Sequence, residues 1–291
     1  EFISVFDADF VPYPDTLEQF VKYFQVTMGT LDPEPSPQGL YHGSKIAVIG
    51  GYQWHVLNKS ENWITRGVRT EYAGSYVIER AGQELLGTLK QISGSVYMAR
   101  ADVVKKIGWG TSITEDFQLT LKMYEQGYKV VYTPYVQAPA ECVSTLKRLI
   151  RQRMRWAEGH SNNIRKMFVR LMWGSRIGAA RVTPSFENNT SPGALRQAQC
   201  KPLRESQFYT YSKDSLDIKK QLRGLFNYLL GKEGHLWQKT NLTFKERIEL
   251  LFTAPYYLQA FFFLVGSLAW LTSELVFKVR LPFWTALWGW T

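Results

Sequence analysis

The residues best suited to chemistry form two acidic pairs. Asp7 and Asp9 follow an apolar run near the start of the chain, and Glu115 and Asp116 come directly after Thr114. Carboxylates in the first turn of a helix are stabilised by the helix dipole, so the second pair by itself is explained equally well as a helix cap. The first pair, elsewhere in the chain, shifts the interpretation toward a binding or catalytic site.

The first pair has the spacing of a cation site. Successive side chains of an extended strand point to opposite faces, so Asp7 and Asp9 point to the same side. One divalent cation, which prefers carboxylate oxygens, could therefore contact both. Two aspartates after a strand also occur in ordinary turns, and this alternative stays open.

A third group lies on a long predicted helix. Gln152, Arg155 and Trp156 stand at positions i, i+3 and i+4, so they share one face of that helix. The guanidinium offers a fork for phosphate, and the indole offers a flat face for a sugar ring. Arg151 and Arg153 are expected to be ordinary surface charges in water.

Alternating strands and helices must position these groups. The apolar run Phe2–Phe6 predicts a strand buried on both faces, and ligands bind beyond the carboxyl ends of such strands. Thr114 predicts the start of a helix that ends at Gly127, with the threonine hydroxyl accepting from a first-turn amide. Further strands are predicted at Lys45–Tyr52, Ile92–Tyr97 and Tyr128–Tyr132, and further helices at residues 63–86 and 141–172.

Charge and hydropathy set the second half of the chain apart. The net charge is +10 over 291 residues, and the whole excess falls in residues 165–248. Such a block suggests an anionic partner, either lipid headgroups or nucleic acid. Amphipathic helices are predicted at Asp217–Leu230 and Phe244–Phe252, and the first has the composition of a helix on a membrane surface. Tyr256–Phe277 is apolar over about the length of a bilayer span.

Two further features limit the class of protein. Cys142 and Cys200 are too few for a disulfide framework, which favours free thiols in a reducing compartment. No His/Cys cluster has zinc-like spacing. Residues 174–207 are basic and rich in small polar residues, and are predicted to form a loop.

Four short motifs follow one another in a fixed order. They are Phe6-Asp7-Ala8-Asp9, Ser93-Gly94-Ser95, Thr114-Glu115-Asp116 and Gln152-Arg153-Met154-Arg155-Trp156. In order and spacing this set resembles the membrane-embedded family 2 glycosyltransferases, which include cellulose, chitin and hyaluronan synthases and bacterial glucan and mannan synthases. The resemblance covers residues 1 to about 170, together with the amphipathic and apolar segments downstream.

The resemblance implies an α/β fold of the GT-A type, with a mixed or parallel sheet and flanking helices, followed by amphipathic interface helices and a transmembrane helix. It assigns residues 1–170 to the C-terminal part of the glycosyltransferase domain, 171–254 to a basic insert with interface helices, and 255–291 to truncated transmembrane segments. The strands that bind the donor nucleotide in the family are expected upstream of Glu1, which makes the chain a fragment in this interpretation.

The resemblance also implies inverting transfer of a hexose from a UDP- or GDP-sugar to a growing β-linked polysaccharide. Asp7 and Asp9 match the aspartates that hold the donor diphosphate through Mg²⁺ or Mn²⁺, and Asp116 matches the general base. Donor and acceptor contacts are expected from Asp7, Gly94, Ser95, Glu115, Gln152, Arg155 and Trp156. Where many members carry a Gly-Thr-Gly step, this chain has Gly94-Ser95-Val96.

Two other functions stay open. One is transfer of a single sugar to a lipid acceptor, and the other is a non-catalytic module that binds polysaccharide, lipid or nucleic acid through the basic block. With the resemblance, the expected partners are a nucleotide sugar, a glycan acceptor and membrane lipid, whereas nucleic acid is not expected. The expected location is the plasma membrane, with the catalytic part on the cytoplasmic side.

Overall fold

The computed structural model describes residues 1–27, 45–58, 61–176, 217–230 and 237–278. Most of the predicted loop at 174–207 lies outside these residues, as does Cys200. In chain order the elements are β1 (Phe2–Val5), α1 (Thr16–Thr27), β2 (Ile46–His55), α2 (Trp63–Ala73), the π-helix η2 (Gly74–Arg80), α3 (Ala81–Leu86), β3 (Tyr97–Arg100), α4 (Ala101–Ile107), α5 (Glu115–Glu125), β4 (Lys129–Ala140), α6 (Leu146–Trp173), β5 (Ser175–Arg176), α8 (Ile218–Leu229), β6 (Trp237–Gln238), α9 (Phe244–Thr253) and α10 (Tyr256–Leu275).

Four strands form one mixed sheet in the order β1-β3-β2-β4. Strand β3 is antiparallel to both β1 and β2, whereas β2 and β4 are parallel. The carboxyl ends of β1, β2 and β4 and the amino end of β3 therefore lie at the same end of the sheet. This arrangement confirms the predicted α/β class and brings the segments after β1 and before β3 together.

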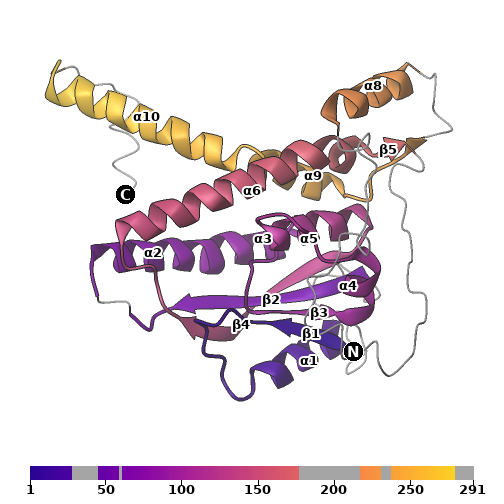
Figure 1. Ribbon diagram of the computed structural model, residues 1–291, viewed down its shortest axis with the longest axis horizontal. Helices are drawn as coiled ribbons and strands as arrows, with labels where there is room; N and C mark the ends of the chain where they lie inside the picture. The colour runs from indigo at the N-terminus through magenta and orange to yellow at the C-terminus, as the bar shows by residue number, and fades with distance from the viewer. Residues whose placement is uncertain (28–44, 59–60, 177–216, 231–236, 279–291) are drawn as a thin grey trace, which may run out of the picture. The chain divides into compact units, whose positions relative to one another are not determined.

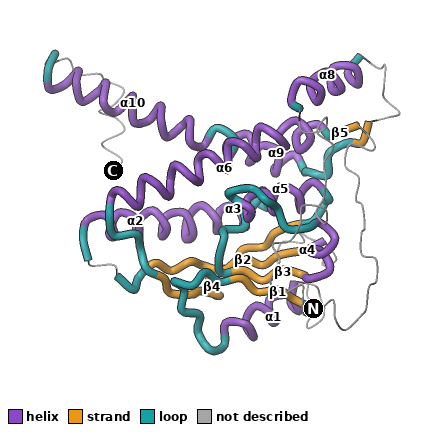
Figure 2. Tube along the Cα trace, viewed as in Figure 1, coloured by secondary structure: helices purple, strands orange, loops and turns teal. Residues whose placement is uncertain are grey.

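Helices cover both faces of this sheet (Figures 1 and 2). Helix α1 lies on one face, where Phe20 and Phe24 join a buried cluster with Ile49, Met98 and Val131. Helices α2, α3 and α5 lie on the other face, and α6 packs against α5. The central strand β2 is buried on both faces over Ile46–Ile49, as its unbroken apolar run predicts.

Two strands differ from the sequence prediction. Strand β4 continues well past Tyr132, because the pairing with β2 tolerates an irregularity that holds Pro134. The strand predicted at Ile92–Tyr97 is wrong, since β3 begins only at Tyr97. Gly94 and Val96 have φ angles of +44° and +56°, which a strand cannot accommodate, so this segment bends sharply before β3.

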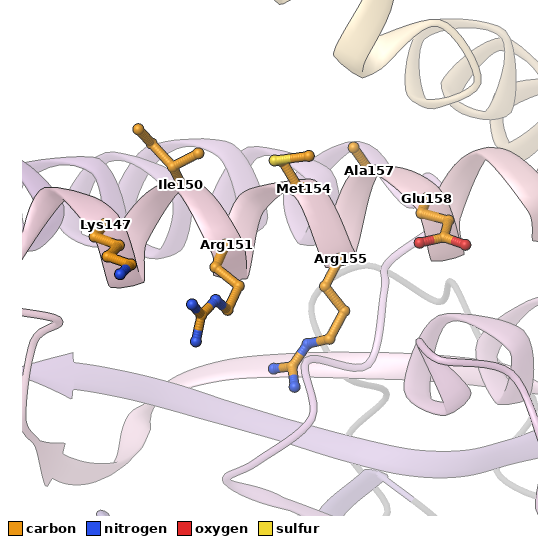
Figure 3. Close-up of a pocket in the computed structure, with 7 residues that line it drawn as sticks. All are labelled: Lys147, Ile150, Arg151, Met154, Arg155, Ala157 and Glu158. Carbon is orange, nitrogen blue, oxygen red and sulfur yellow. The ribbon is translucent and has the colours of Figure 1, made fainter.

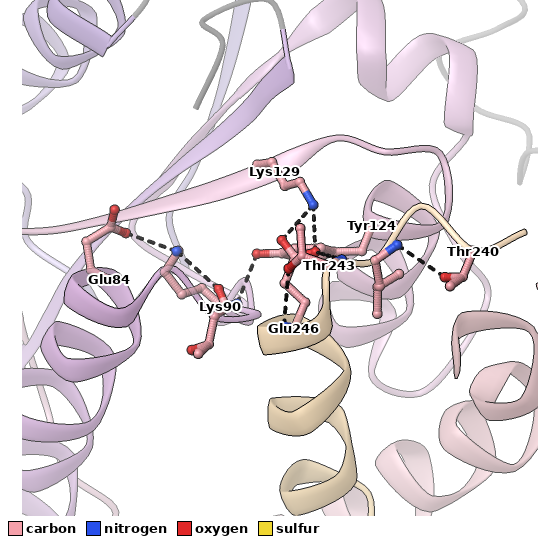
Figure 4. A network of polar contacts seen from close by, with 9 residues as sticks. Glu84, Lys90, Tyr124, Lys129, Thr240, Thr243 and Glu246 are labelled. Carbon is pink, nitrogen blue, oxygen red and sulfur yellow. Dashed lines mark hydrogen bonds and ion pairs between the residues drawn. The ribbon is translucent and has the colours of Figure 1, made fainter. Parts of the chain in front are cut away.

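The predicted helix near residue 244 is confirmed, and its first turn is fixed to the sheet (Figure 4). The Thr243 N–H donates to Glu246 Oε2 over 2.8 Å, and the Glu246 N–H donates to Thr243 Oγ1 over 3.3 Å. Lys129, the first residue of β4, contacts Glu246 Oε1 at 2.6 Å in a buried ion pair. A capping box and a charge pair thus anchor α9.

The predicted helix at Asp217–Leu230 is also confirmed, as α8. The Asp217 carboxylate accepts from the Lys219 N–H over 2.9 Å and so caps the helix. Helix α8 packs on α6, where Gln221 Nε2 donates to the Lys166 carbonyl over 3.0 Å.

Of the two cysteines, Cys142 is a free, buried thiol.

The chain divides into two compact units, Glu1–Glu249 and Leu250–Thr291. In the second unit, α10 occupies most of the apolar run predicted at Tyr256–Phe277. Among the described helices, none is both long enough and apolar enough to cross a bilayer, so the expected transmembrane helix is not supported.

Candidate active site

Three of the predicted motifs meet at the end of the sheet where β1 stops and β3 starts. The N–H of Asp7, just after β1, donates to Ser95 Oγ over 2.9 Å. The Gly94 N–H donates to Asp116 Oδ2 over 2.8 Å. Two hydrogen bonds therefore join motifs that are far apart in the sequence.

Gly94 lies between the carboxylates of the two acidic pairs. Its φ of +44° is a conformation that favours glycine. A Cβ atom at this position would lie 3.6 Å from Asp116 Oδ2 and 4.0 Å from Asp7 Oδ2. Both carboxylates therefore lie close to one backbone position, where the φ angle rather than lack of space favours glycine.

The bend at residues 93–95 is held by β2 and by the π-helix η2. Gln53 Nε2 donates to the carbonyls of Ser93 and Ser95, the second bond measuring 2.9 Å. The buried Tyr76 donates its hydroxyl to Ser93 Oγ over 2.6 Å. Wide π-helical turns are frequent at functional sites, and this one brings Tyr76 to the bend.

Val96, directly after the bend, holds a strained conformation. Its φ is +56°, although β-branched residues rarely adopt the left-handed region. Such a residue costs roughly 1–3 kcal/mol, and persists only where its surroundings over-determine it. Val96 is fully buried in the core cluster with Ile49 and Val136, and this packing holds it in place.

The carboxylates at this end of the sheet repel one another. Burial raises the pKa of Asp116 above the ordinary value of 3.8, while hydrogen bonds from the N–H groups of Phe117 and Gly94 act in the opposite direction. Partial burial also raises the pKa of Asp7, and the negative charges of Asp9, Glu115 and Asp116 raise it further. Among the described residues, none of the groups that shift the pKa of Asp7 is positively charged.

Helix α5 begins at Glu115 as predicted, but the Thr114 hydroxyl does not cap it. Instead, Asn163 Nδ2 on α6 donates to Thr114 Oγ1 over 3.0 Å and to the Thr114 carbonyl over 3.2 Å. Asn163 is only 1% exposed, so its amide must find acceptors inside the protein. A long-range partner thus engages the hydroxyl that local sequence assigned to the cap.

The third predicted group lies on α6 with unequal exposure. Arg155 is exposed, whereas Gln152 and Trp156 are half-buried. The Oε1 atom of Gln152 is shielded from water and has no hydrogen-bond partner among the described residues. An unpartnered acceptor and an exposed guanidinium on one face suit a ligand with hydroxyl and phosphate groups.

The expectation that Arg153 is a free surface charge is wrong. Its guanidinium contacts Glu71 Oε2 at 2.7 Å and lies 4.5 Å from the ring centre of Trp156. The ion pair therefore ties α6 to α2, whereas the cation–π contact lies within α6. Arg151, by contrast, is exposed as expected.

Arg155 opens onto a shallow depression of about 780 Å³ along α6 (Figure 3). Arg151 and Arg155 project to one side of the helix, whereas Ile150 and Met154 project to the other. The remaining lining residues that the structure describes are Lys147, Ala157 and Glu158. The basic side chains border this depression, but its lining surface is largely apolar.

The carboxylates fit a divalent cation that also binds a ligand. Within the described residues, no group of three or more His, Cys, Asp or Glu side chains could hold a metal ion. Mg²⁺ is commonly bound through one or two carboxylates together with substrate phosphates. Asp7 and Asp9 lie in a turn after β1, closed by the Phe10 N–H, which donates to the Asp7 carbonyl over 3.1 Å, so the strand alternation expected to align them does not apply. A cation bound by these carboxylates would relieve the repulsion at Asp7.

Sequence reasoning missed three residues that support the site, Gln53, Tyr76 and Asn163. The role of Tyr76 could not be predicted, because its position depends on a π-helical turn that the spacing of apolar residues in the sequence does not indicate. Asn163 did give one, since a buried asparagine inside a helix is disfavoured unless its amide is engaged. Gln53 was a polar residue next to an apolar strand, and its bonds to the 93–95 carbonyls explain its burial.

The chain is similar to plant enzymes of known family. It is 27% identical over 179 residues to glucomannan 4-beta-mannosyltransferase 1 of Oryza sativa subsp. japonica, a match that covers 61% of this chain and 31% of that protein. It is 26% identical over 181 residues to probable glucomannan 4-beta-mannosyltransferase 3 of Arabidopsis thaliana, covering 62% and 30%. The chain thus spans about a third of the length of the curated relatives it matches.

The family assignment does not depend on these relatives. A sequence profile described as glycosyl transferase family group 2 matches residues 2–290. That range includes both acidic pairs, the bend at Gly94 and the whole of α6. The chain belongs to the glycosyl transferase family group 2.

Proposed function

We propose that this chain forms the catalytic part of an inverting glycosyltransferase that extends a β-linked polysaccharide from a nucleotide sugar. The observation that carries the proposal is the position of Gly94, which lies between the carboxylates of Asp116 and Asp7 and donates its N–H to the first. The names of the two plant relatives favour a mannosyl donor such as GDP-mannose.

Asp116 is the proposed general base. Its Oδ2 accepts from the Gly94 N–H, and a carboxylate that accepts from backbone N–H groups still has lone pairs for the hydroxyl of the acceptor sugar. As that hydroxyl oxygen bonds to C1 of the donor sugar, its proton passes to Asp116, and the bond from C1 to the diphosphate oxygen breaks with its electrons on the diphosphate. A base works best when its pKa lies near the working pH, and burial moves the pKa of Asp116 in that direction.

The leaving diphosphate needs its charge neutralised. Asp7 and Asp9 are the residues that would hold Mg²⁺ or Mn²⁺, and the cation when bound supplies positive charge to the departing phosphates. The exposed guanidinium of Arg155 is a second source of such charge. The unpartnered Gln152 Oε1 is an acceptor for a sugar hydroxyl on the same helix face.

Sugar transfer tests this function in the full-length protein. Membranes containing it would be supplied with radiolabelled GDP-mannose or UDP-glucose, with Mn²⁺ or with a chelator. We expect label in an alkali-stable polymer only when the cation is present. Label on a single lipid-extractable sugar would overturn polysaccharide extension, and salt-sensitive nucleic-acid binding without any transfer would overturn the catalytic assignment.

We also propose that the protein works at the cytoplasmic face of the plasma membrane. Helix α8 supports this, since Leu222, Phe226 and Leu229 are 49%, 61% and 68% exposed on a helix that also carries basic side chains. Flotation with vesicles containing anionic lipid tests it. A Phe226→Asp/Leu229→Asp variant should float less than the wild type and a Lys147→Ala control, and equal flotation of all three would contradict α8 as a contact.

A further inference from the structure

Helix α6 lies so close to the residues that precede the proposed base that there is no room for a side chain on α6 at the point of contact. A Cβ atom on Gly159 would lie 2.5 Å from both Cγ2 and Oγ1 of Thr114, and 2.6 Å from Cγ2 of Ile113. Both distances are too short for real atoms, so only glycine permits this approach. Thr114 immediately precedes α5, the helix whose first turn contains Asp116.

Asn163 holds Thr114 from the next turn of α6. Its Nδ2 donates to the hydroxyl and to the carbonyl of Thr114, and its side chain is almost completely buried. Its Oδ1 atom has no hydrogen-bond partner within the described part of the chain. A buried, unpartnered acceptor is unfavourable, so an apolar residue of similar size would serve packing alone at least as well.

We propose that Gly159 and Asn163 are positioning residues that act through Thr114 to hold the Asp116 carboxylate against the Gly94 N–H. Gly159 lets the two segments meet, and Asn163 fixes their relative position by two bonds. The role in catalysis rests on the proposed function of Asp116, whereas the mechanical connection rests on the contacts alone.

This connection links two parts of the site. Helix α6 carries Gln152 and Arg155 near its start and Gly159 and Asn163 farther along. The element that presents groups to the donor therefore also fixes the base. Misplacing a catalytic group by about 1 Å can cost about 10²-fold in rate, so a small shift of Thr114 is expected to be visible in turnover.

The first test compares kinetics of four variants of the full-length enzyme. Asn163→Leu removes the donors and keeps the number and branching of the side-chain heavy atoms, and Gly159→Ala forces Thr114 to move. We expect kcat for sugar transfer to fall about 10- to 100-fold with little change in the donor KM. Asn162→Ala, one position away, and Gly67→Ala, where a Cβ meets nothing within 4 Å, are the matched controls and should behave like the wild type.

The pH dependence separates positioning from general loss of structure. The Gly94 N–H bond lowers the pKa of Asp116, so weakening that bond should move the acid limb of the kcat profile to higher pH in both test variants. The proposal would be overturned if kcat fell only in step with a lower melting temperature and the acid limb of the kcat profile did not move. So would wild-type kinetics in Asn163→Leu.

Amide hydrogen exchange provides a readout that needs no activity. In the wild type the amides of Gly94, Asp116 and Phe117 should be protected, and both test variants should exchange them faster while the sheet amides remain unchanged. Unchanged exchange would overturn the connection. Faster exchange in the variants of a protein whose wild type transfers no sugar would support the connection and reject the proposed function instead.

Discussion

Carboxylates occur in two contrasting environments within the first unit. At the amino end of β4, Glu246 contacts Lys129 at 2.6 Å, and the side chains are 2% and 10% exposed. Nearby, Lys90 contacts Glu84 at 3.3 Å (Figure 4). At the proposed active site, by contrast, Asp7 and Asp116 share the space around Gly94 with no positive partner acting on Asp7 among the described residues.

The carboxylates with a close lysine stabilise the fold, whereas the carboxylates around Gly94 are available to bind a ligand. A buried carboxylate with a close cation is already compensated, so it gains little from a further partner. Carboxylates whose pKa values are raised by burial and by one another are poised to bind a cation or a proton. Substitutions in the two clusters should therefore affect different quantities, catalysis in one and stability in the other.

The largest expected effect is on turnover. Asp116→Asn keeps the size of the side chain and an acceptor for the Gly94 N–H but removes the ability to take a proton, so transfer should fall by roughly 10²–10⁴-fold. Because the substitution also removes a repelled charge, the melting temperature should stay level or rise. Turnover and thermal unfolding of the full-length enzyme provide the measurement.

Glu115→Gln is the matched control for Asp116→Asn. It removes one negative charge from the same helical turn, and Glu115 makes no bond to Gly94, so turnover should change far less. Near-normal turnover in Asp116→Asn would remove the base assignment and, with it, the contrast between the two clusters.

A large effect on stability is expected from the paired cluster. Lys129→Met leaves the buried Glu246 without its cation, which typically costs about 3–5 kcal/mol in the free energy of unfolding. Adding Glu246→Gln should recover much of this loss, since glutamine is uncharged and can still accept from the Thr243 N–H. Urea denaturation measures both variants, and reduced turnover per folded Lys129→Met molecule would show that this cluster also serves the site.

A smaller effect should follow pH around Lys122, where compensation is incomplete. Burial lowers the pKa of Lys122 to about 8. The negative charge of Glu125 opposes this shift only in part, since Glu125 also pairs with Arg170 at 2.8 Å. Between pH 8 and its ordinary pKa of 10.5 the unfolded chain binds more protons at this residue than the folded chain does. The free energy of unfolding should therefore rise with pH, by about 1–2 kcal/mol between about pH 8 and pH 9.5 at a value of about 1.4 kcal/mol per pKa unit.

The measurement is a series of urea denaturations between about pH 8 and pH 9.5. Burial raises the pKa of the Cys142 thiol above 9.0 and the pKa of Tyr97 and Tyr132 above 10.0, so the thiol opposes the trend near the upper end of the window and the tyrosines oppose it above pH 10. Lys122→Met should flatten the series. A slope of the same size in that variant would assign the effect to another group.

Local patterns in the sequence predicted most of the fold. The apolar run before Asp7 and the helical spacing after Thr114 placed both acidic pairs at element ends, and the rule that ligands lie beyond strand ends led to one site. Local chemistry sufficed at Thr243, whose hydroxyl caps α9 as its partner three residues later suggests. It failed at Thr114, because the competing partner is Asn163, far away along the chain.

The bend at the centre of the site was the least predictable part. Residues 92–97 have the composition of a strand, and a valine at position 96 argues against a left-handed conformation. The bend exists because Gln53 and Tyr76 hold its polar groups and the core holds Val96. The expectation for Arg153 failed for the same kind of reason, since its partner Glu71 is defined only once α2 and α6 pack together.

Because the strand order is β1-β3-β2-β4, the site can form only late in the synthesis of the chain. Phe2 pairs with Arg100, so the pairing of β1 with β3 must wait until nearly a hundred residues have followed β1 from the ribosome. Pairings between such distant segments must overcome a large loop-closure entropy and form slowly. Even then Thr114 has no support before α6 is made. A message cut short after β4 would encode both acidic pairs and the whole sheet, but not the helix that holds the base in place.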